Sequence, residues 1–572
     1  MLLVKKLNKR LEKSFNGKVH AVLKDGCLHL TGVLNDWNDV VRAGLMSVNK
    51  KKYTVVNDIN FTGGRTSSMG MPFLATNLLA GKSPDVLIIG GGIIGCSIAR
   101  ELMRYKLDVM LVEKEHDVAL HASGRNNGTI HSGMELKKGQ LKKFYNDAGN
   151  SMYPQVCSEL NVPFHRTGQY LCFTNTLLKP AVLASLLYWK LTGVQVKYIS
   201  RSKLLIKEPH LRKKIKYALF FPSAGVVCPY GLTIAYAENA VNNGASFNLD
   251  TVVIDMDVWN GNIISVLTNH GKIHPKLVIN AAGVFADEIA RFANDRFFSI
   301  HPKRSTNIVF DKKTGHLVSS IISLIKNFKV SFYKKIDILS DGVVRTVSGN
   351  LLVGSNAVET YEKEDFSTNR DNMKTVLAKY RRTIPELSRL DIITYFSGIR
   401  AVTYEDDFII SFGKNTRNII HAAGIQLPGL TAAPAIAADV SKMAAKYLKA
   451  DENADFNPIR KAIVRSADLP DEERDSLIKD DPNYGMVICN CEEVSRGEII
   501  SSLNRSIPCD TLDGVKRRVR AGMGRCQGSF CSPHVMQIIS EKTNLPIEKI
   551  NKMSMNSNIL FGNVKETLYD GK

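Results

Sequence analysis

Four cysteines near the C-terminus have the spacing of ligands to a metal centre. They form two tight pairs, Cys489 with Cys491 and Cys526 with Cys531, and 34 residues separate the pairs. Such pairs can bind zinc, form disulfides or hold an iron–sulfur cluster. Structural zinc sites usually use pairs separated by two residues, so the C-x-C pair counts against zinc. Cys509, between the pairs, is not expected to be a ligand.

A glycine-rich turn near residue 90 has the spacing that binds a dinucleotide. A strand, a turn with Gly90, Gly92 and Gly95, and a helix are predicted here. The first glycine permits the tight turn, the second lets a pyrophosphate approach the backbone, and the third allows the helix to pack closely on the strand. Unpaired N–H groups at the helix start, around Ile93 and Ile94, would face the phosphates.

An acidic residue follows the next predicted strand. The run 108–114 ends in Glu113 and Lys114, and an acid at this distance from the glycines binds a ribose hydroxyl. The cofactor can be FAD or NAD. The stretch 121–134 combines small residues, a basic residue and amides, which suits a loop that wraps a long dinucleotide. Its candidate cofactor-binding residues are Ser123, Arg125, Asn126 and Asn127.

These residues must be held by an α/β domain, because strand-like runs alternate with helical patterns through the main body of the sequence. A chain of 572 residues is also too long for one core. We expect a small α+β unit at 1–60, a linker at 61–83, the main body at 84–450, a linker at 451–483, a cysteine-bearing domain at 484–540 and a tail at 541–572.

The formal net charge of +21 is large. It can favour nucleic acid, an anionic membrane surface, or anionic substrates and cofactors. No recognised nucleic-acid motif accompanies it and the lysines are scattered, so nucleic-acid binding is not expected. No apolar run is long enough to span a bilayer, and the N-terminus lacks the apolar core of a signal peptide. We expect a cytoplasmic protein, with peripheral association at the inner face of the cell membrane left open.

The main body resembles the D-amino-acid-oxidase-type flavoproteins, in the branch that contains L-2-hydroxyglutarate oxidases and FAD-dependent glycerol-3-phosphate dehydrogenases. The first two motifs of this resemblance along the chain are the glycine turn and the loop at 121–134. Six further motifs follow in the family's order, at 167–173, 221–245, 278–290, 349–357, 396–401 and 419–437. The resemblance implies FAD as the cofactor.

The resemblance also assigns FAD contacts beyond the glycine turn. Val253, Ala282 and Gly283 would lie in the FAD site, the last two near the adenosine. A second segment would place backbone N–H groups along the pyrimidine edge of the flavin, where the N-terminus of a small-residue helix stabilises negative charge. Its residues are Gly424, Pro428, Gly429, Leu430 and Thr431.

The resemblance places two residues near the reacting substrate. His131 can take the hydroxyl proton as a base, or it can only hydrogen-bond FAD or a core carbonyl. Arg400 matches an arginine directed at a substrate carboxylate or phosphate, or it forms a structural salt bridge. Lys303 and Arg304 are weaker candidates for the same anion, and His301 and His421 are expected to be satisfied core or surface histidines.

The sequence departs from the family at several positions that line or support the substrate pocket. Ser305, Thr306 and Asn307 stand where relatives usually carry Gly-Glu-Tyr, and Ser348 replaces a histidine. The segment 320–344 does not resemble the usual one. The class of reaction therefore carries over better than the identity of the substrate.

The C-terminal segment closely resembles the bacterioferritin-associated-ferredoxin-like [2Fe-2S] domain, which implies that the four cysteines ligate a [2Fe-2S] cluster. Ser495 and Glu498 predict a capping box at the start of one helix. Ser532 and Pro533 predict the start of another, with Cys531 at its N-terminus. Nearby cations would offset the negative charge of the cluster. They are Lys516, Arg517, Arg518 and Arg520.

The N-terminal unit is predicted as helix, two strands joined at Asp25-Gly26, helix and strand. It resembles a BON domain, a module associated with binding membranes or other proteins, or it is a family-specific extension. The expected fold class is α/β: a Rossmann-like FAD-binding domain with an interleaved α+β substrate domain, plus the small N-terminal α+β module and a helical C-terminal Fe-S domain.

Together these features predict a flavin dehydrogenase that oxidises a small anionic hydroxy compound. The expected reaction is sn-glycerol 3-phosphate to dihydroxyacetone phosphate, by hydride transfer to flavin N5. Electrons would then pass through the [2Fe-2S] cluster to an acceptor protein or a quinone. L-2-Hydroxyglutarate is the alternative substrate. A redox adaptor that binds both cofactors without catalysis is the alternative from another class.

Overall fold

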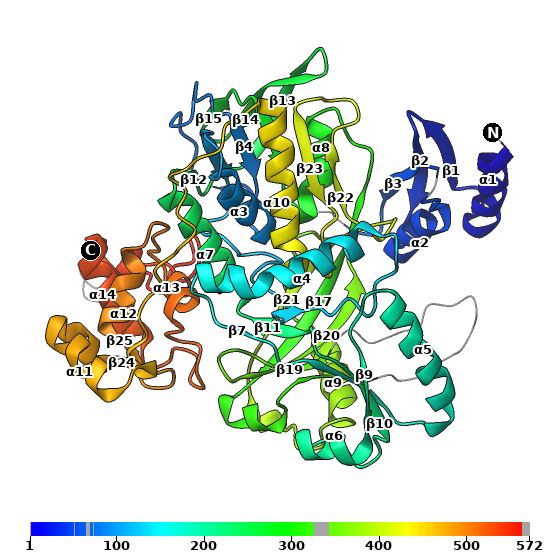
Figure 1. Ribbon diagram of the computed structural model, residues 1–572. Coiled ribbons are helices and arrows are strands. Elements are labelled where there is room, and N and C mark those ends of the chain that lie inside the picture. The colour runs from blue at the N-terminus through cyan, green and yellow to red at the C-terminus, as the bar shows by residue number, and fades with distance from the viewer. Residues whose placement is uncertain (1, 51, 65–68, 73, 325–341, 563–572) are drawn as a thin grey trace, which may run out of the picture.

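The computed structural model describes residues 2–50, 52–64, 69–72, 74–324 and 342–562. A large central body carries the N-terminal unit on one side and the C-terminal domain on the other (Figure 1). Most of the unusual segment 320–344 lies outside the described residues. Its two described ends form β18 (Ile321–Leu324) and β19 (Gly342–Arg345).

A six-stranded sheet forms the first layer of the central body. In spatial order its strands are β12 (Ser246–Asn248), β5 (Val109–Val112), β4 (Val86–Ile89), β16 (Leu277–Asn280), β23 (Ile419–Ala423) and β22 (Ile409–Phe412). All neighbours are parallel except β22 and β23. The apolar runs read as strands because both faces of a parallel sheet are covered and buried.

The two faces of this sheet are separated by the alternation of side chains along each strand. Val86 and Ile88 of β4 pack against α3 (Ile93–Leu102), α7 (Pro229–Asn242) and α10 (Gly429–Leu448). Leu87 and Ile89 point to the opposite face, into a second core. That core is closed by α8 (Ala286–Phe292) and by the three-stranded sheet of β13 (Val253–Trp259), β14 (Asn262–Thr268) and β15 (Gly271–Ile273).

An eight-stranded sheet forms the other half of the central body. In spatial order its strands are β21 (Ile392–Thr403), β17 (Ile300–Phe310), β20 (Leu351–Glu359), β19, β18, β8 (Gln169–Phe173), β10 (Tyr217–Phe221) and β9 (Lys197–Ser200). The helices α5 (Lys179–Leu191), α6 (Arg201–Lys207) and α9 (Arg370–Arg381) accompany it (Figure 1). Strands of the two large sheets alternate along the chain, so the predicted interleaving of an α+β substrate domain with the Rossmann-like domain is confirmed.

Shorter elements join the two halves. A small sheet contains β6 (Thr129–Ile130), β11 (Gly225–Val227) and β7 (Phe164–His165). The helix α4 (Leu141–Glu159) packs along α10. Gly149 of α4 allows this close approach, because a Cβ there would collide with the carbonyl oxygen of Thr431.

The N-terminal unit has the predicted order of elements. It comprises α1 (Leu2–Phe15), β1 (Val19–Lys24), β2 (Cys27–Leu34), α2 (Trp37–Ser47) and β3 (Thr54–Phe61). Leu7, Leu11 and Phe15 of α1 are buried, whereas Leu3 is 39% exposed. The unit contacts the central body, where Asn57 Nδ2 donates to the hydroxyl of Tyr404 at 2.7 Å.

The C-terminal domain is mainly helical. Its elements are α11 (Asp471–Asp480), β24 (Val487–Cys489), β25 (Val494–Ser495), α12 (Arg496–Leu503), α13 (Leu512–Val519) and α14 (Ser532–Thr543). The capping box of Ser495 and Glu498 is present at the start of α12. Cys531 stands directly before α14, as predicted. The segment expected to be a plain connection also contains α11.

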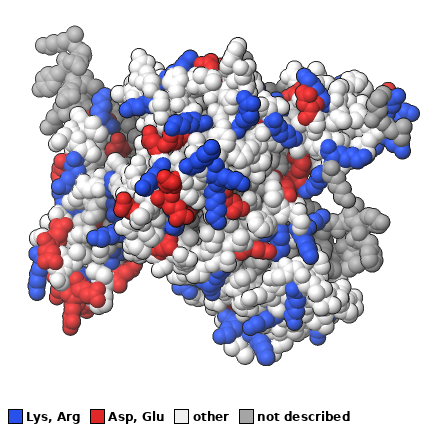
Figure 2. Space-filling model, turned by 45° about the horizontal axis from the view of Figure 1, so that its top comes forward, with Lys and Arg blue, Asp and Glu red and all other residues white. Residues whose placement is uncertain are grey.

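Charged side chains of both signs are interspersed over the face shown in Figure 2. Acidic side chains gather at its left edge, on the side of the molecule where α11 lies, and the first turn of α11 contributes Asp471, Glu472 and Glu473. Among the helices that the structure describes, none combines the length and the hydropathy needed to cross a bilayer.

Candidate functional site

The glycine turn between β4 and α3 forms a cradle from which side chains are absent. Gly90 has a φ of +112°, and a Cβ there would lie 2.5 Å from the carbonyl oxygen of Ala281. A Cβ at Gly95 would collide with the carbonyl oxygen of Gly90, so this glycine holds α3 against the turn. Gly92 has no side chain to cap α3, but Ser123 Oγ accepts from the N–H of Ile93, so the expected unpaired N–H there is occupied and the N–H of Ile94 is the next one that can face an anion. The cradle fits the pyrophosphate of a dinucleotide.

Glu113 follows β5 and supports the same turn. Its carboxylate accepts hydrogen bonds from the backbone N–H groups of Gly91 at 2.5 Å and Glu115 at 2.9 Å. Burial raises the pKa of the Glu113 carboxyl. The position and acceptor capacity of Glu113 suit a ribose hydroxyl, as predicted for this acid.

Lys114 also borders the cofactor cavity, but its ammonium is held by carboxylates. Its Nζ donates to Glu115 at 2.6 Å and to Glu364. His121 lies 2.8 Å from the same carboxylate of Glu115, and although burial opposes ionisation, His121 and Lys114 together lower the pKa of Glu115 to about 2. Because an ammonium already sits among these carboxylates, the cluster is a network of ion pairs.

The loop at 121–131 is shaped by its own polar side chains. Ser123 Oγ accepts from the N–H of Ile93 at 2.8 Å, which ties the loop to α3. Asn126 and Asn127 accept from the backbone N–H groups of Gly128 and Thr129. The guanidinium of Arg125 donates to the Leu120 carbonyl at 2.8 Å and lies 4.2 Å from the ring of Phe366.

Two adjoining cavities of about 130 and 170 Å³ form one elongated site, with Gly92, Ser123 and Gly283 in the lining of both. Most of the predicted cofactor residues line it: Gly90, Gly92, Ile93, Ile94, Glu113, Lys114, Ser123, Arg125, Asn126, Asn127, Val253, Ala282, Gly283, Pro428, Gly429 and Leu430. Three do not reach the lining and act through the backbone or packing: Gly95, Gly424 and Thr431. The shape and the glycine cradle fit FAD.

The start of α10 borders the cavity at the end opposite Glu113. Pro428 precedes the helix and provides no side-chain cap, and the N–H of Gly429 donates to the Gln426 carbonyl, so the next N–H groups, those of Leu430 and Thr431, are the ones that can receive negative charge. The hydroxyl of Thr431 accepts from the backbone N–H of His131 at 2.9 Å. This bond fixes His131 beside the helix start, where the flavin pyrimidine edge is expected.

His131 is buried and its ring is oriented by a carboxylate. Nδ1 lies 3.1 Å from Oε1 of Glu135, and the residue is 5% exposed. With Nδ1 facing a carboxylate, Nε2 is the nitrogen that can exchange a proton with a ligand. His131 lines the same cavity as Arg400. The geometry permits His131 to act as a base.

Arg400 projects from β21 into the cavity. Its Nη2 donates to the hydroxyls of Ser305 at 3.0 Å and Ser355 at 2.8 Å. These two serines come from the neighbouring strands β17 and β20. These hydroxyls help to orient the guanidinium, whose planar fork of N–H donors suits the carboxylate or phosphate of an anionic substrate.

The structure shows where the residues that depart from the family pattern lie relative to the substrate cavity. Ser305 and Asn307 line the substrate end of the cavity, while Thr306 is buried and its hydroxyl pairs with Ser397 at 2.8 Å. Asn307 is 3% exposed, and its Oδ1 has no hydrogen-bond partner among the described residues. Ser348 lies outside this cavity, in the lining of a third one. Ser355 had no sequence signal of its own.

The weaker candidates for the substrate site form pairs with carboxylates of the protein instead. Lys303 pairs with Glu359 at 2.7 Å, and Arg304 pairs with Asp365. His301 contacts the same Glu359 at 2.9 Å. His421 is fully buried against Asp295 at 2.8 Å, as expected for a satisfied core histidine.

The four cysteines of the C-terminal domain come together as two pairs. The thiols of Cys489 and Cys531 lie close enough to shift each other's pKa, and so do those of Cys491 and Cys526. In the first pair the pKa of Cys489 falls to about 6, while that of Cys531 is raised by its neighbour Cys489.

This pairing discriminates between metal centres. A single zinc ion needs its four ligands around one point, at about 2.3 Å each. In the described part of the chain, no three of these thiols lie within 4.8 Å of one another. Two pairs of thiolates suit a cluster in which each iron takes two, so the donor set fits [2Fe-2S] better than zinc. Cys509 is buried elsewhere, with its Sγ 3.6 Å from the Ser502 carbonyl, and stays outside the set.

Two basic residues of α13 join domains, in addition to the charge that they are expected to supply beside the cluster. Arg517 and Arg518 both pair with Asp117, at 2.9 and 2.8 Å. Since Asp117 follows Glu113 by four residues, these two arginines tie the C-terminal domain to the loop that holds the ribose end of the cofactor site. Arg520 pairs at 2.7 Å with Glu492, the residue after Cys491, and so stays beside the cysteines.

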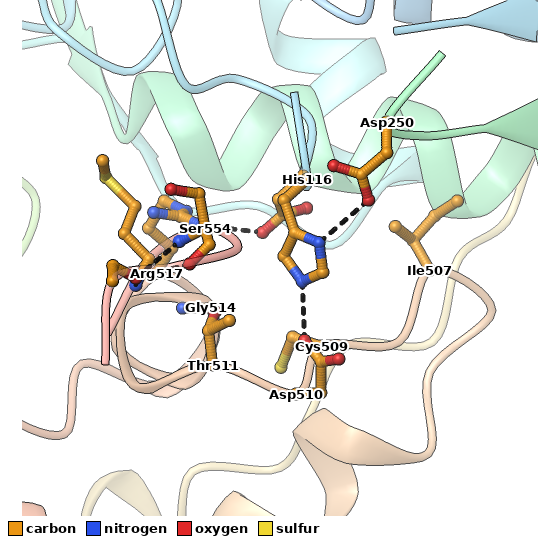
Figure 3. A network of polar contacts seen from close by, with 12 residues as sticks. His116, Asp250, Ile507, Cys509, Asp510, Thr511, Gly514, Arg517 and Ser554 are labelled. Atoms are coloured by element: carbon orange, nitrogen blue, oxygen red, sulfur yellow. Dashed lines mark hydrogen bonds and ion pairs between the residues drawn. The ribbon is translucent and has the colours of Figure 1, made fainter. Parts of the chain in front are cut away.

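A histidine strengthens this joint. His116 lies between Asp250 of the central body and Asp510 of the C-terminal domain, at 3.1 and 2.7 Å (Figure 3). Hydrogen bonds to the two carboxylates raise the pKa of His116 to about 10. Arg517 contacts the same loop nearby (Figure 3). The sequence did not indicate this joint, because His116 and Asp510 are 394 residues apart.

Comparison with known proteins agrees with this geometry. Residues 85–443 match the family described as FAD dependent oxidoreductase (DAO), and residues 487–541 match the BFD-like [2Fe-2S] binding domain. The glycerol 3-phosphate dehydrogenase of Caloramator mitchellensis is 39% identical over 489 residues, which cover 84% of this chain and 99% of the relative.

Two further relatives extend the comparison. The L-2-hydroxyglutarate dehydrogenase of Indibacter alkaliphilus is 26% identical, over 63% of this chain and 99% of the relative. The structure of the dithionite-reduced L-alpha-glycerophosphate oxidase from Mycoplasma pneumoniae, with FAD bound, superposes with a TM-score of 0.61 at 25% identity. It covers 66% of this chain and 98% of the oxidase. The chain therefore belongs to the DAO family of FAD-dependent oxidoreductases, and it carries a BFD-like [2Fe-2S] binding domain at its C-terminal end.

Proposed function

We propose that the protein oxidises sn-glycerol 3-phosphate to dihydroxyacetone phosphate. The observation that carries the proposal is that His131 and Arg400 line one cavity beside the start of α10. A base and an anion-binding guanidinium are thus available to one small ligand, next to the expected flavin edge. The relative with 39% identity is named for dehydrogenation of the same substrate.

Each residue has a distinct task in this proposal. Arg400 binds the phosphate through charge-assisted hydrogen bonds and is held in place by Ser305 and Ser355. His131, oriented by Glu135, takes the proton of the reacting hydroxyl. Bound FAD supplies the acceptor for the hydride.

The single guanidinium of Arg400 suits a phosphate ester of an alcohol better than a dicarboxylate. A phosphate places its charge on one group, which Arg400 can bind as a fork. L-2-Hydroxyglutarate carries its charges on two separate carboxylates, and Arg400 can bind only one of them. It remains the alternative substrate because a relative named for it shares the fold and 26% of aligned residues.

We infer that electrons leave the flavin through the [2Fe-2S] cluster to an acceptor protein or a quinone. Besides the four cluster ligands, the other six cysteines form no disulfide, which suits a reducing compartment and supports a cytoplasmic location. The net charge of +21 would favour peripheral contact with an anionic membrane surface, at the inner face of the cell membrane. The N-terminal unit is the candidate partner-binding module.

Steady-state turnover with a dye acceptor tests the substrate. The purified holoenzyme is assayed with glycerol 3-phosphate, with L-2-hydroxyglutarate and with glycerol, which lacks the anion. We expect turnover with glycerol 3-phosphate and a value of kcat/KM at least about 100-fold lower with glycerol, since charge-assisted hydrogen bonds are lost. A higher kcat/KM with L-2-hydroxyglutarate would make that compound the substrate in place of glycerol 3-phosphate. No turnover with any of the three compounds would favour a redox adaptor without catalytic activity.

A further inference from the structure

A third cavity lies where the central body meets the C-terminal domain. Its volume is about 300 Å³. The loop at 124–127 forms one wall, and the eight-stranded sheet contributes apolar side chains such as Leu352 and Phe396. The opposite wall comes from the C-terminal domain, through Lys516 and Met523 among others.

The lining combines apolar surfaces with positive charge. Valine, leucine, proline, phenylalanine and methionine side chains provide flat apolar contacts. Basic side chains stand around them, namely Arg125, Lys516, Arg517 and Arg520, against one acid, Asp513. Asp513 already pairs with Lys552 at 3.3 Å, whereas within the described part of the chain the Lys516 ammonium makes neither an ion pair nor a hydrogen bond. Since Arg517 and Arg520 are already paired with Asp117 and Glu492, the positive charge that faces the cavity comes from Arg125 and Lys516.

Polar groups at the border of the cavity are incompletely satisfied. The hydroxyl of Thr346 and the Nε–H of Arg517 have no hydrogen-bond partner among the described residues. Buried donors without partners are uncommon in folded proteins and often indicate a missing ligand or water. Apolar walls with a few convergent polar groups are the usual composition of a small-molecule site.

The cavity also lies between the two redox sites. Arg125, Asn126 and Asn127 line both it and the cofactor cavity. On the other side, Met523 and Gln527 belong to the segment that carries Cys526. A ligand here would contact the loop that wraps the flavin and the loop that holds a cluster ligand.

We propose that this cavity binds a planar, negatively charged two-electron carrier with two ring carbonyls. The inference rests on the proposed function, for which it supplies an acceptor site. In the complete reaction the substrate alcohol loses two electrons and two protons and becomes a ketone. The carrier takes up the same two electrons and two protons, and its two carbonyl oxygens become hydroxyls.

The test uses 1,4-naphthoquinone-2-sulfonate as the probe and measures its binding to the oxidised holoenzyme by equilibrium dialysis. Uncharged 1,4-naphthoquinone is the matched ligand without the anion. Lys516→Gln removes a cavity cation, and Lys542→Gln is its control on the exposed end of α14. Val347→Trp fills the cavity from a lining loop, and Leu390→Trp adds the same side chain at a surface position that is 89% exposed.

We expect the sulfonate to bind more tightly than the uncharged quinone. Val347→Trp should weaken binding of both probes at least about tenfold, and Lys516→Gln should weaken the sulfonate selectively, since it removes the charge that recognises the anion. Both control variants should bind like the parent. Bleaching of the flavin by glycerol 3-phosphate should persist in Val347→Trp, which shows that the enzyme is folded and loaded.

Two results would overturn the inference. One is a parent enzyme that glycerol 3-phosphate bleaches but that binds neither probe. The other is equal probe binding by the parent, Lys516→Gln and Val347→Trp. Failure of glycerol 3-phosphate to bleach the flavin, with probe binding intact and cavity-dependent, would instead reject the proposed substrate and leave the cavity assignment standing.

Discussion

The Nε2 atom of His116 lies 2.7 Å from Oδ1 of Asp510, which joins the loop after Glu113 directly to the C-terminal domain. The same loop holds Asp117, the partner of two arginines of α13. One short segment thus supports the ribose end of the cofactor site and docks the [2Fe-2S] domain. This arrangement fixes the flavin site and the cluster relative to each other.

The joint should weaken as pH rises. His116 has a pKa of about 10 in the folded protein, against an ordinary value of about 6.5. A raised pKa means that its contribution to stability is complete below about pH 6.5 and is lost as pH rises through about 10. His116→Gln should lower the free energy of unfolding by about 2 kcal/mol at pH 6, a value typical of hydrogen bonds to charged groups.

Denaturant unfolding at pH 6 and pH 10 measures this effect. The difference between parent and His116→Gln should shrink toward zero at the higher pH. His20→Gln, at an exposed position of the N-terminal unit, is the matched control and should behave like the parent at both pH values. A pH-independent difference would show that His116 does not act through its charge.

The cysteine set predicts a clear loss of metal on substitution. Cys489→Ser or Cys526→Ser should remove the visible absorption and the iron of the cluster, because each iron needs two thiolates. Cys509→Ser is the control within the same domain and should retain iron, since its thiol is buried in the domain core and donates to the Ser502 carbonyl. Iron analysis of anaerobically purified protein checks the prediction, and full iron content in Cys489→Ser would contradict the ligand assignment.

Removal of the proposed base should affect turnover more than binding. His131→Gln should lower kcat by about 100- to 10,000-fold, the usual range for a general base, while FAD content stays unchanged. Glu135→Gln should cause a smaller loss, because it only orients the ring. The FAD-to-protein ratio and kcat are measured together. An unchanged kcat in His131→Gln would leave this histidine a purely structural role.

Arg400 should determine affinity for the anion. Arg400→Ala should raise KM for glycerol 3-phosphate by about 10- to 150-fold, the equivalent of roughly 1.5–3 kcal/mol for a hydrogen bond to a charged group. Added guanidinium chloride should restore part of the activity by occupying the vacated space between Ser305 and Ser355. Arg382→Ala, at an exposed position after α9, is the control. An unchanged KM in Arg400→Ala would show that this guanidinium has only a structural role and does not bind the substrate.

Local patterns predicted the chemistry better than the long-range arrangement. Gly90, Glu113 and the cysteine pairs could be assigned because strand, turn and cap signals lie within a few residues of each site. The contacts of Ser305 and Ser355 with Arg400 could not, since they depend on the pairing of three strands from distant parts of the chain. Asn307 departs from the usual family motif, yet it lines the substrate end of the cavity.

The roles of charged residues were the hardest to predict. A run of basic residues beside cysteines predicts compensation of the cluster's charge, but it does not predict that Arg517 and Arg518 also contact Asp117 across the domain joint. Which residue forms an ion pair with a charged side chain at a domain surface depends on how the domains pack together. The periodicity of the sequence contains no information about that packing. For the same reason, His116 carried no signal despite its two carboxylate partners.

The central claim is that substrate electrons pass from the flavin to the cluster. Anaerobic holoenzyme titrated with glycerol 3-phosphate, and followed by absorption and EPR spectroscopy, tests it most directly. We predict that the oxidised flavin absorption bleaches and that the EPR signal of a reduced [2Fe-2S] cluster appears during the same titration. Flavin that stays oxidised, or bleached flavin beside a cluster that remains EPR-silent, would contradict the account.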